Sequence, residues 1–98
     1  MTISKSSNEG ALTFAIDGRL DANSAPVLEE ELNGSLDGVA ELTLDFKGLD
    51  YISSAGLRLL LSAQKRMVKQ GKMRLVNVCE AVMEVFDMTG FTDILTIG

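Results

Sequence analysis

Two adjacent serines, Ser53 and Ser54, are the residues best placed for a chemical role, because they stand where a strand and turn give way to a long helix. Serine is favoured at a helix N-terminus, and the sequence predicts Ser54 at the capping position. Free N–H groups and the positive end of the helix dipole favour an anion there. A phosphate on Ser54 would add about −1.5 to −2 charges without unfolding the domain. The alternative is that Ser54 only caps the helix.

The residue inventory excludes most other site chemistry. The chain has no histidine, no tryptophan and one cysteine, so histidine triads, histidine metal centres and CxxC motifs are absent. Cys79 is expected to be a small packed thiol. The net charge of −5 and the few aromatic residues argue against a nucleic-acid partner.

An enzyme built on paired carboxylates remains as an alternative, with Asp21, Asp45 and Asp50 as its candidate groups. No G-x-S-x-G elbow or phosphate-binding glycine loop accompanies them. The sequence therefore predicts a protein that is not an enzyme and that holds no metal or cofactor.

The chain lacks the signature of a membrane segment. Its longest apolar run covers only residues 59–61, whereas a bilayer span needs roughly 20 apolar residues. The first residues lack the apolar stretch of a signal peptide. A single cysteine fits a reducing compartment. We therefore expect a cytoplasmic protein that does not insert into membranes.

The hydrophobic pattern predicts alternating strands and helices within one domain covering residues 1–98. Residues 18–21 are expected to break a strand with a turn, and a second turn is expected at residues 47–50; each segment contains one glycine. The predicted strands cover residues 2–7, 11–17, 41–46, 73–78 and 95–97, and the predicted helices cover residues 24–34, 55–70 and 81–88, with 38 as an alternative end for the first. This order favours an open mixed sheet with helices packed on it.

The predicted helix over residues 55–70 has an apolar side and a basic side. At 100° per residue, its core face comprises Leu57, Leu60, Leu61, Gln64, Met67 and Val68, and its opposite side comprises Arg58, Ser62, Lys65, Arg66 and Lys69. Leu59 falls among the polar residues, flanked by Ala55 and Ala63. It marks either a partner-contact patch or ordinary surface.

Charge is segregated along the chain. Six of the nine basic residues lie between Arg58 and Arg74, whereas residues 75–98 carry four acids and no base. Such segregation suits an oriented contact with another protein. The alternative is that the basic residues only form a solvated helix face.

Four segments together resemble the STAS family, and within it the bacterial anti-sigma factor antagonists. They are residues 18–21 followed by Ala25 and Leu28, the strand 42–46, the stretch 51–58, and residues 85–91. The resemblance covers nearly the whole chain. It implies an α/β fold in which a small mixed sheet carries helices packed mainly on one side.

The resemblance also implies a partner-switching cycle without enzymatic activity in this chain. The unphosphorylated antagonist binds an anti-sigma factor that is also a serine kinase, and the sigma factor is released. The kinase then phosphorylates and ejects the antagonist, and a serine phosphatase reverses the modification. Alignment on Gly56 and Leu57 places the phosphorylated serine on Ser54. Many antagonists carry aspartate where this chain has Ser53, so Ser53 is a rival acceptor.

The expected partner surface covers the phosphorylation site, the turn over residues 21–24 and the outer side of the long helix. It comprises Asp21, Asn23, Ser24, Ser53, Ala55, Gly56, Arg58, Leu59, Ser62, Ala63 and Arg66. Gly56 is included because a residue without a side chain lets a partner approach the backbone. In the alternative within this family, the domain is an accessory or scaffold subunit of a transporter or stress-signalling complex, and Ser54 is only a cap.

Overall fold

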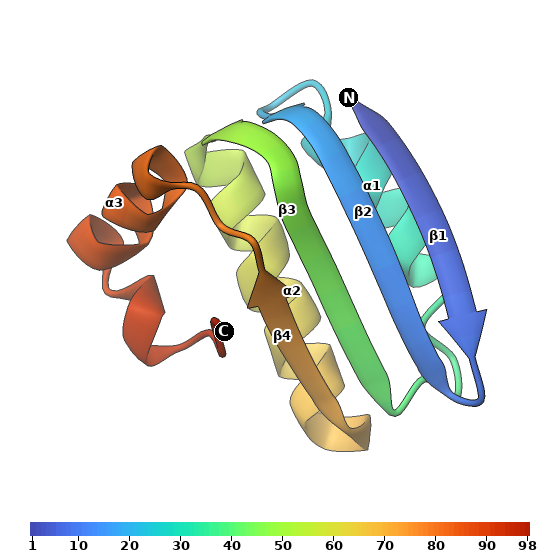
Figure 1. Cartoon of the computed structure of the whole chain (residues 1–98). Coiled ribbons are helices and arrows are strands. Elements are labelled where there is room, and N and C mark those ends of the chain that lie inside the picture. The colour runs from blue at the N-terminus through green and yellow to red at the C-terminus, as the bar shows by residue number, and fades with distance from the viewer.

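One mixed sheet of four strands organises the computed structural model, which describes residues 1–98 (Figure 1). The strands are β1 (Thr2–Asn8), β2 (Ala11–Leu20), β3 (Glu41–Ile52) and β4 (Lys72–Val76), in the order β1-β2-β3-β4. β1 runs antiparallel to β2, whereas β2, β3 and β4 are mutually parallel. The carboxyl ends of β2 and β3 therefore meet at one edge of the sheet.

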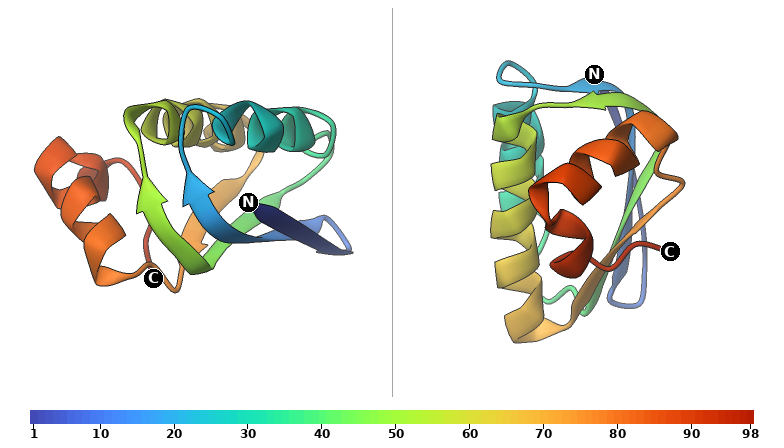
Figure 2. Two further views of the ribbon diagram at one scale, coloured as in Figure 1. Left: turned by 90° about the horizontal axis from the view of Figure 1, so that it is seen from above. Right: turned by 90° about the vertical axis from the view of Figure 1, so that its left-hand side faces the viewer.

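Two helices cover one face of this sheet. α1 (Ala25–Asn33) and α2 (Ser54–Gln70) form a layer on the same side, and the opposite face stays open (Figure 2). α3 (Glu80–Thr89) and the short 3-10 helix η1 (Phe91–Asp93) lie beyond β4 (Figure 1). This arrangement confirms the predicted α/β fold with helices mainly on one side. None of the helices has the length and apolar character needed to cross a membrane.

The hydrophobic core lies between the sheet and its helix layer. Alternate residues of β2 and β3 point into it, and Phe14 and Phe46 are fully buried there in the same cluster as Leu60 and Met67 of α2. Phe14 and Phe46 fall within the predicted strands 11–17 and 41–46. Cys79 is half-buried against this core, and its thiol donates to the Leu49 carbonyl oxygen at 3.5 Å, as expected for a packed cysteine.

Two predicted turns are wrong, because β2 and β3 continue through them. The chain stays in the sheet through residues 18–20 and 47–52. The pairing of the two strands shifts register twice, and Gly18 adopts a φ of +109° between the shifts. Such bulges let a strand accommodate an extra residue while pairing continues.

The predicted strand 95–97 is also wrong in extent. Only Ile97 forms a bridge, to Leu75 of β4, and η1 precedes it. Phe86 and Phe91 stack with ring centroids 6.5 Å apart, which fixes α3 to η1. The end of the chain is joined to β4 by two backbone hydrogen bonds, from Leu75 N to the Thr96 carbonyl oxygen and from Gly98 N to the Leu75 carbonyl oxygen, each at 2.9 Å.

Candidate functional site

The candidate site forms where β2 and β3 end side by side. Leu20 pairs with Ile52, and the next residue, Ser53, donates its backbone N–H to the Leu20 carbonyl oxygen at 2.9 Å. The turn after β2 and the first turn of α2 are therefore neighbours (Figure 1). The parallel register thus brings together residues 21–24 and 53–58, which are far apart in the sequence.

Ser53 caps α2, which corrects the prediction that Ser54 does so. Ser53 has an extended backbone, with φ −99° and ψ 176°, and its hydroxyl oxygen accepts a hydrogen bond from Gly56 N at 3.4 Å. The helix starts at Ser54 because β3 pairs with β2 up to Ile52 and the chain turns at the next residue. Ser54 is exposed, and its hydroxyl makes no hydrogen bond within the protein.

The neighbouring turn is held by the side chains of Asp21 and Ser24. The Asp21 carboxylate accepts hydrogen bonds from the backbone N–H groups of Asn23 and Ser24, each at 3.0 Å. The Ser24 hydroxyl accepts from Asp21 N at 2.9 Å and donates to the Arg19 carbonyl oxygen at 2.6 Å. The backbone N–H of Ser24, followed by that of Asn23, keeps the pKa of Asp21 below its ordinary value. This turn therefore presents a fixed negative charge, with Asn23 exposed beside it.

Gly56 faces the core, which corrects the expectation that a partner approaches its backbone. The residue is buried, and a Cβ atom placed there would lie 2.8 Å from Ile52 Cγ1 and 2.9 Å from Leu20 Cγ. Glycine is therefore needed for α2 to pack closely on the ends of β2 and β3. Gly56 therefore sets the position of the start of α2 on the sheet, and because it is buried it offers no surface to a partner.

Leu59 and Ala63 are buried as well, with exposed fractions of 5% and 6%, which corrects their assignment to the outer side of α2. α1 packs beside α2 and covers this second apolar strip of the helix. Val68 was predicted in the core but is 66% exposed. The buried arc of α2 is turned towards α1 because the helix packs against two neighbours, a sheet and a helix.

The remaining predicted residues differ in accessibility. Arg58 and Ser62 are exposed on the outer side of α2, Ala55 is half-buried, and Arg66 pairs with Asp37 at 2.8 Å. α2 contains no acidic residue. Arg58, Lys65 and Lys69 form no salt bridge, so the outer side of α2 carries three free positive charges.

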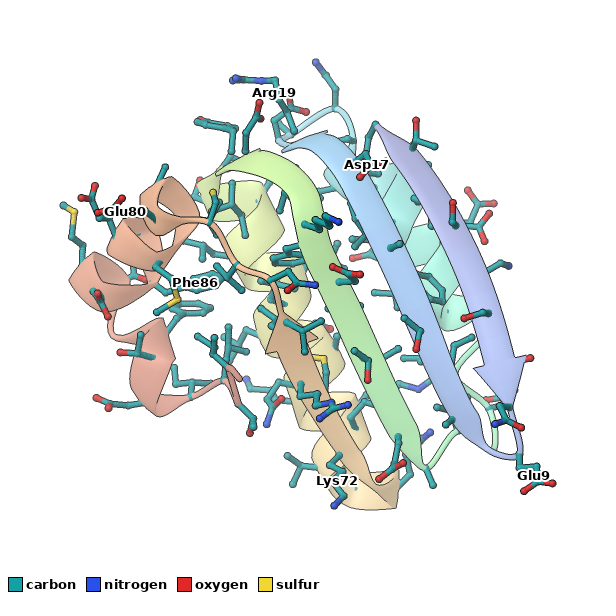
Figure 3. The ribbon with its side chains drawn as sticks, viewed as in Figure 1. Glu9, Asp17, Arg19, Lys72, Glu80 and Phe86 are labelled. Atoms are coloured by element: carbon teal, nitrogen blue, oxygen red, sulfur yellow. The ribbon has the colours of Figure 1, made fainter.

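Sequence reasoning missed two residues at this edge. The Arg19 guanidinium lies 4.0 Å from the centroid of the Tyr51 ring, a cation–π contact between the ends of β2 and β3. Figure 3 shows Arg19 at the same edge as the turn, whereas Glu9 and Lys72 lie at the opposite edge. Both Arg19 and Tyr51 were expected near turns, and only the parallel pairing of the two residues reveals their contact.

Asp45, one of the three acidic residues of the enzyme alternative, lies away from the edge where Asp21 follows β2 and Asp50 lies near the end of β3. Asp45 lies seven residues before Ile52 on β3, which places it about 20 Å from the edge that carries Asp21. Its carboxylate accepts from Lys47 N and Asn77 Nδ2, each at 3.0 Å. These bonds, that of Asn77 first, lower the pKa of Asp45. No cluster of three or more histidine, cysteine, aspartate or glutamate residues suits a metal ion.

The comparison with protein families decides the family. A model of the STAS domain matches residues 2–98. The chain belongs to the STAS domain family. This STAS chain is 36% identical over 92 residues to the anti-sigma-B factor antagonist of Bacillus subtilis, covering 93% of this chain and 84% of that protein.

Solved structures of anti-sigma factor antagonists share the fold. The anti-sigma factor antagonist from Mycobacterium paratuberculosis matches with a TM-score of 0.88 at 21% identity, over 98% of this chain and 83% of that one. Unphosphorylated SpoIIAA, also an anti-sigma factor antagonist, matches with a TM-score of 0.84 at 17% identity, over 99% and 88%. Its phosphorylated form, described as a Bacillus cell fate determinant, gives 0.76 at 16% identity, over 99% and 91%.

Proposed function

We propose that this STAS chain is an anti-sigma factor antagonist that is switched off by phosphorylation of Ser54. The observation that carries the proposal is the exposed Ser54 hydroxyl, free of hydrogen bonds, beside the ordered turn at Asp21. The antagonist of Bacillus subtilis at 36% identity supports the role. The neighbouring Ser53 is the weaker acceptor because its oxygen already holds the helix cap.

In this proposal the chain supplies only the acceptor of a phosphoryl transfer. The Ser54 oxygen bonds to the γ-phosphorus of a nucleoside triphosphate held by the anti-sigma factor kinase. The bond from that phosphorus to the bridging oxygen breaks, the nucleoside diphosphate leaves, and the hydroxyl proton passes to a base of the kinase. Hydrolysis by a serine phosphatase restores the hydroxyl. The chain itself needs no catalytic group or cofactor.

The proposed docking surface is smaller than the one expected from the sequence. It comprises the exposed or half-buried residues Asp21, Asn23, Ser24, Ser53, Ser54, Ala55, Arg58, Ser62 and Arg66. Gly56, Leu59 and Ala63 are left out because they are buried. A phosphate dianion enclosed in this interface would be desolvated at a large cost. A loss of about 3 kcal/mol in binding lowers affinity more than a hundredfold.

We further propose that residues 1–98 act in the cytoplasm as one domain that contacts neither nucleic acid nor the membrane interior. The net charge of −5 supports the first exclusion. The lack of a membrane-crossing helix is consistent with the second.

Substitution of Ser54 tests the switch. Ser54→Ala is expected to retain the anti-sigma factor kinase in a pull-down from the native host, whereas Ser54→Glu is expected to lose it. Wild-type protein and Ser53→Ala should each gain one phosphate, and Ser54→Ala should gain none. Intact-mass and peptide mass spectrometry measure this directly.

Two other outcomes would overturn the proposal. A phosphate that persists in Ser54→Ala and disappears in Ser53→Ala would move the acceptor to Ser53. Equal retention of transporter or scaffold proteins by Ser54→Ala and Ser54→Glu, without any phosphate on the wild type, would support the accessory-subunit alternative.

A further inference from the structure

Arg58 is an exposed cation without a partner, one helical turn after Ser54. It makes no salt bridge or hydrogen bond, in contrast to Arg66, which pairs with Asp37, and Arg19, which lies over Tyr51. α2 contains no acidic residue that could pair with Arg58. The spacing of Arg58 from Ser54 would allow it to pair with a phosphate on that serine.

Residues four apart on a helix have Cβ atoms about 5–6 Å apart, within reach of an arginine side chain. Side chains in a helix also lean towards its N-terminus, so a residue covers the turn before its own Cα. The i, i+4 spacing therefore places Ser54 within reach of the Arg58 side chain. An acid that precedes its base by four residues is the favourable order for a helical ion pair.

Apart from Asp21 on the neighbouring turn, the start of α2 lacks the negative charge that such helix ends favour. The first turn of α2 holds no acid, and the Ser53 cap is neutral. Phosphorylated Ser54 would supply about −1.5 to −2 charges and three acceptor oxygens at this point. The planar guanidinium of arginine can donate two parallel hydrogen bonds to a phosphate, which a lysine cannot do.

We propose that Arg58 binds an acidic side chain of the partner while Ser54 is unmodified, and that it pairs with the phosphate once Ser54 is phosphorylated. The inference deepens the proposed function. One modification then changes the docking surface in two ways. It adds the negative charge of the phosphate, and it engages the Arg58 cation so that the partner can no longer pair with it. The partner half of the inference rests on the proposed function, whereas the ion pair does not.

The ion pair is tested on protein that carries phosphoserine at position 54, installed during translation so that no kinase is needed. Phosphorus NMR titration measures the second pKa of the phosphate, which is about 6 for free phosphoserine. We expect this pKa to be about half a pH unit higher in Arg58→Ala than in wild type. Arg58→Lys should lie between them, because it keeps the charge and loses the paired hydrogen bonds.

Lys69→Ala is the matched control, since Lys69 is an exposed, unpaired cation on the same helix. It lies 15 residues after Ser54, or about 22 Å along the helix axis. This variant should titrate like wild type. Equal phosphate pKa values in wild type and Arg58→Ala would overturn the ion pair. An equal rise in Lys69→Ala would do so too, because it would indicate a general effect of charge.

The partner half is tested with unphosphorylated protein and the purified anti-sigma factor kinase. Arg58→Ala should bind about twofold to fivefold more weakly, the range for one exposed ion pair. If Arg58→Ala bound the kinase as tightly as wild type, the proposed contact between Arg58 and the partner would be wrong. The ion pair between Arg58 and the phosphate would still be decided by the phosphate titration. If wild-type protein binds no such kinase, the proposed function fails, and the titration result stands separately.

Discussion

Ser53 and Ser54 are neighbours with the same side chain and different surroundings. The Ser53 oxygen accepts the hydrogen bond that begins α2, whereas the Ser54 hydroxyl faces solvent without a partner. The difference arises because β3 pairs with β2 as far as Ile52 and so fixes which residue turns into the helix. The backbone therefore divides a structural role and a chemical role between two identical residues.

Ser53→Ala is expected to destabilise the protein by about 0.5–1 kcal/mol, the lower part of the range for loss of a serine cap. The hydrogen bond that it removes is long, at 3.4 Å, which places the cost in that lower part. Urea denaturation measures the change. Ser54→Ala is the control and should stay within about 0.5 kcal/mol of wild type. If Ser54→Ala lost more stability than Ser53→Ala, the cap of α2 would belong to Ser54, and the assignment to Ser53 would be wrong.

Asp45 should make stability depend on pH in acid. Its hydrogen bonds from Asn77 and from Lys47 N lower its pKa in the folded state, so the unfolded chain binds the proton more readily. The stabilisation is therefore present above the unfolded pKa of about 3.9 and is lost as the pH falls through the folded value. Asp45→Asn keeps an acceptor oxygen but cannot titrate.

We expect Asp45→Asn to flatten part of the fall in unfolding free energy between about pH 5 and pH 2. Asp21 should account for a further part, since its pKa is lowered as well. Urea denaturation across this pH range provides the measurement. Asp50→Asn, at an exposed site, serves as control. An unchanged slope in Asp45→Asn would show that its hydrogen bonds do not favour the charged form.

At the scale of elements, the connection from α2 to β4 passes close to the backbone of Ala40. A Cβ atom at Gly71 would overlap the backbone carbonyl group of Ala40, whereas one at Gly48 would overlap the carboxylate of Asp17. Backbone cannot move away as a side chain can. Gln70, just before this junction, donates to the carbonyl oxygens of Leu36 and Val39 at 2.6 and 2.7 Å. The far end of α2 is thereby attached to the segment that leads into β3.

Gly71→Ala should therefore destabilise the protein by about 2–3 kcal/mol, whereas Gly48→Ala should cost less than about 1 kcal/mol. Thermal and urea denaturation of the two variants compare the costs. Each adds the same methyl group, so the pair isolates the effect of what the methyl group meets. Equal costs would mean that the Ala40 backbone moves as easily as the Asp17 side chain.

The packing of the elements also explains which structural features could be predicted from the sequence. Alternation in β2 and β3 marked the core strands, because each has one face against the helix layer. The face of α2 was misread at Leu59 and Val68, because a helical wheel assumes one neighbour and α2 has two. The turn at Asp21 and the serines were both recognised, yet their contact depends on parallel pairing that no local pattern encodes.

At the scale of the molecule, the local charge on the outer side of α2 is opposite in sign to the net charge of the chain. The chain carries −5 in total, whereas the outer side of α2, the helix that begins at Ser54, carries three free cations along its length. A partner that docks on α2 meets a locally positive surface on a negative protein. Such a distribution orients the two proteins as they approach.

Association of the unphosphorylated chain with its proposed kinase partner should therefore slow as salt rises, by several fold between about 50 and 500 mM NaCl. Lys65→Gln should reduce this salt dependence while leaving the dissociation rate nearly unchanged. Stopped-flow mixing measures both rates. Association that accelerates with salt would indicate an acidic docking surface on this chain and would contradict the orientation.

The amino terminus lies at the same edge as the candidate site. Met1 lines a shallow hollow with Asp21 and Ser24, and its Cα atom would lie 3.3 Å from a Cβ at Gly18. Gly98, by contrast, donates to the Leu75 carbonyl oxygen and lies away from that edge (Figure 1). A fluorescent dye on the amino group of Met1 would therefore report docking in real time. An affinity tag fused at the same end would compete with the partner for space, so purification handles belong after Gly98.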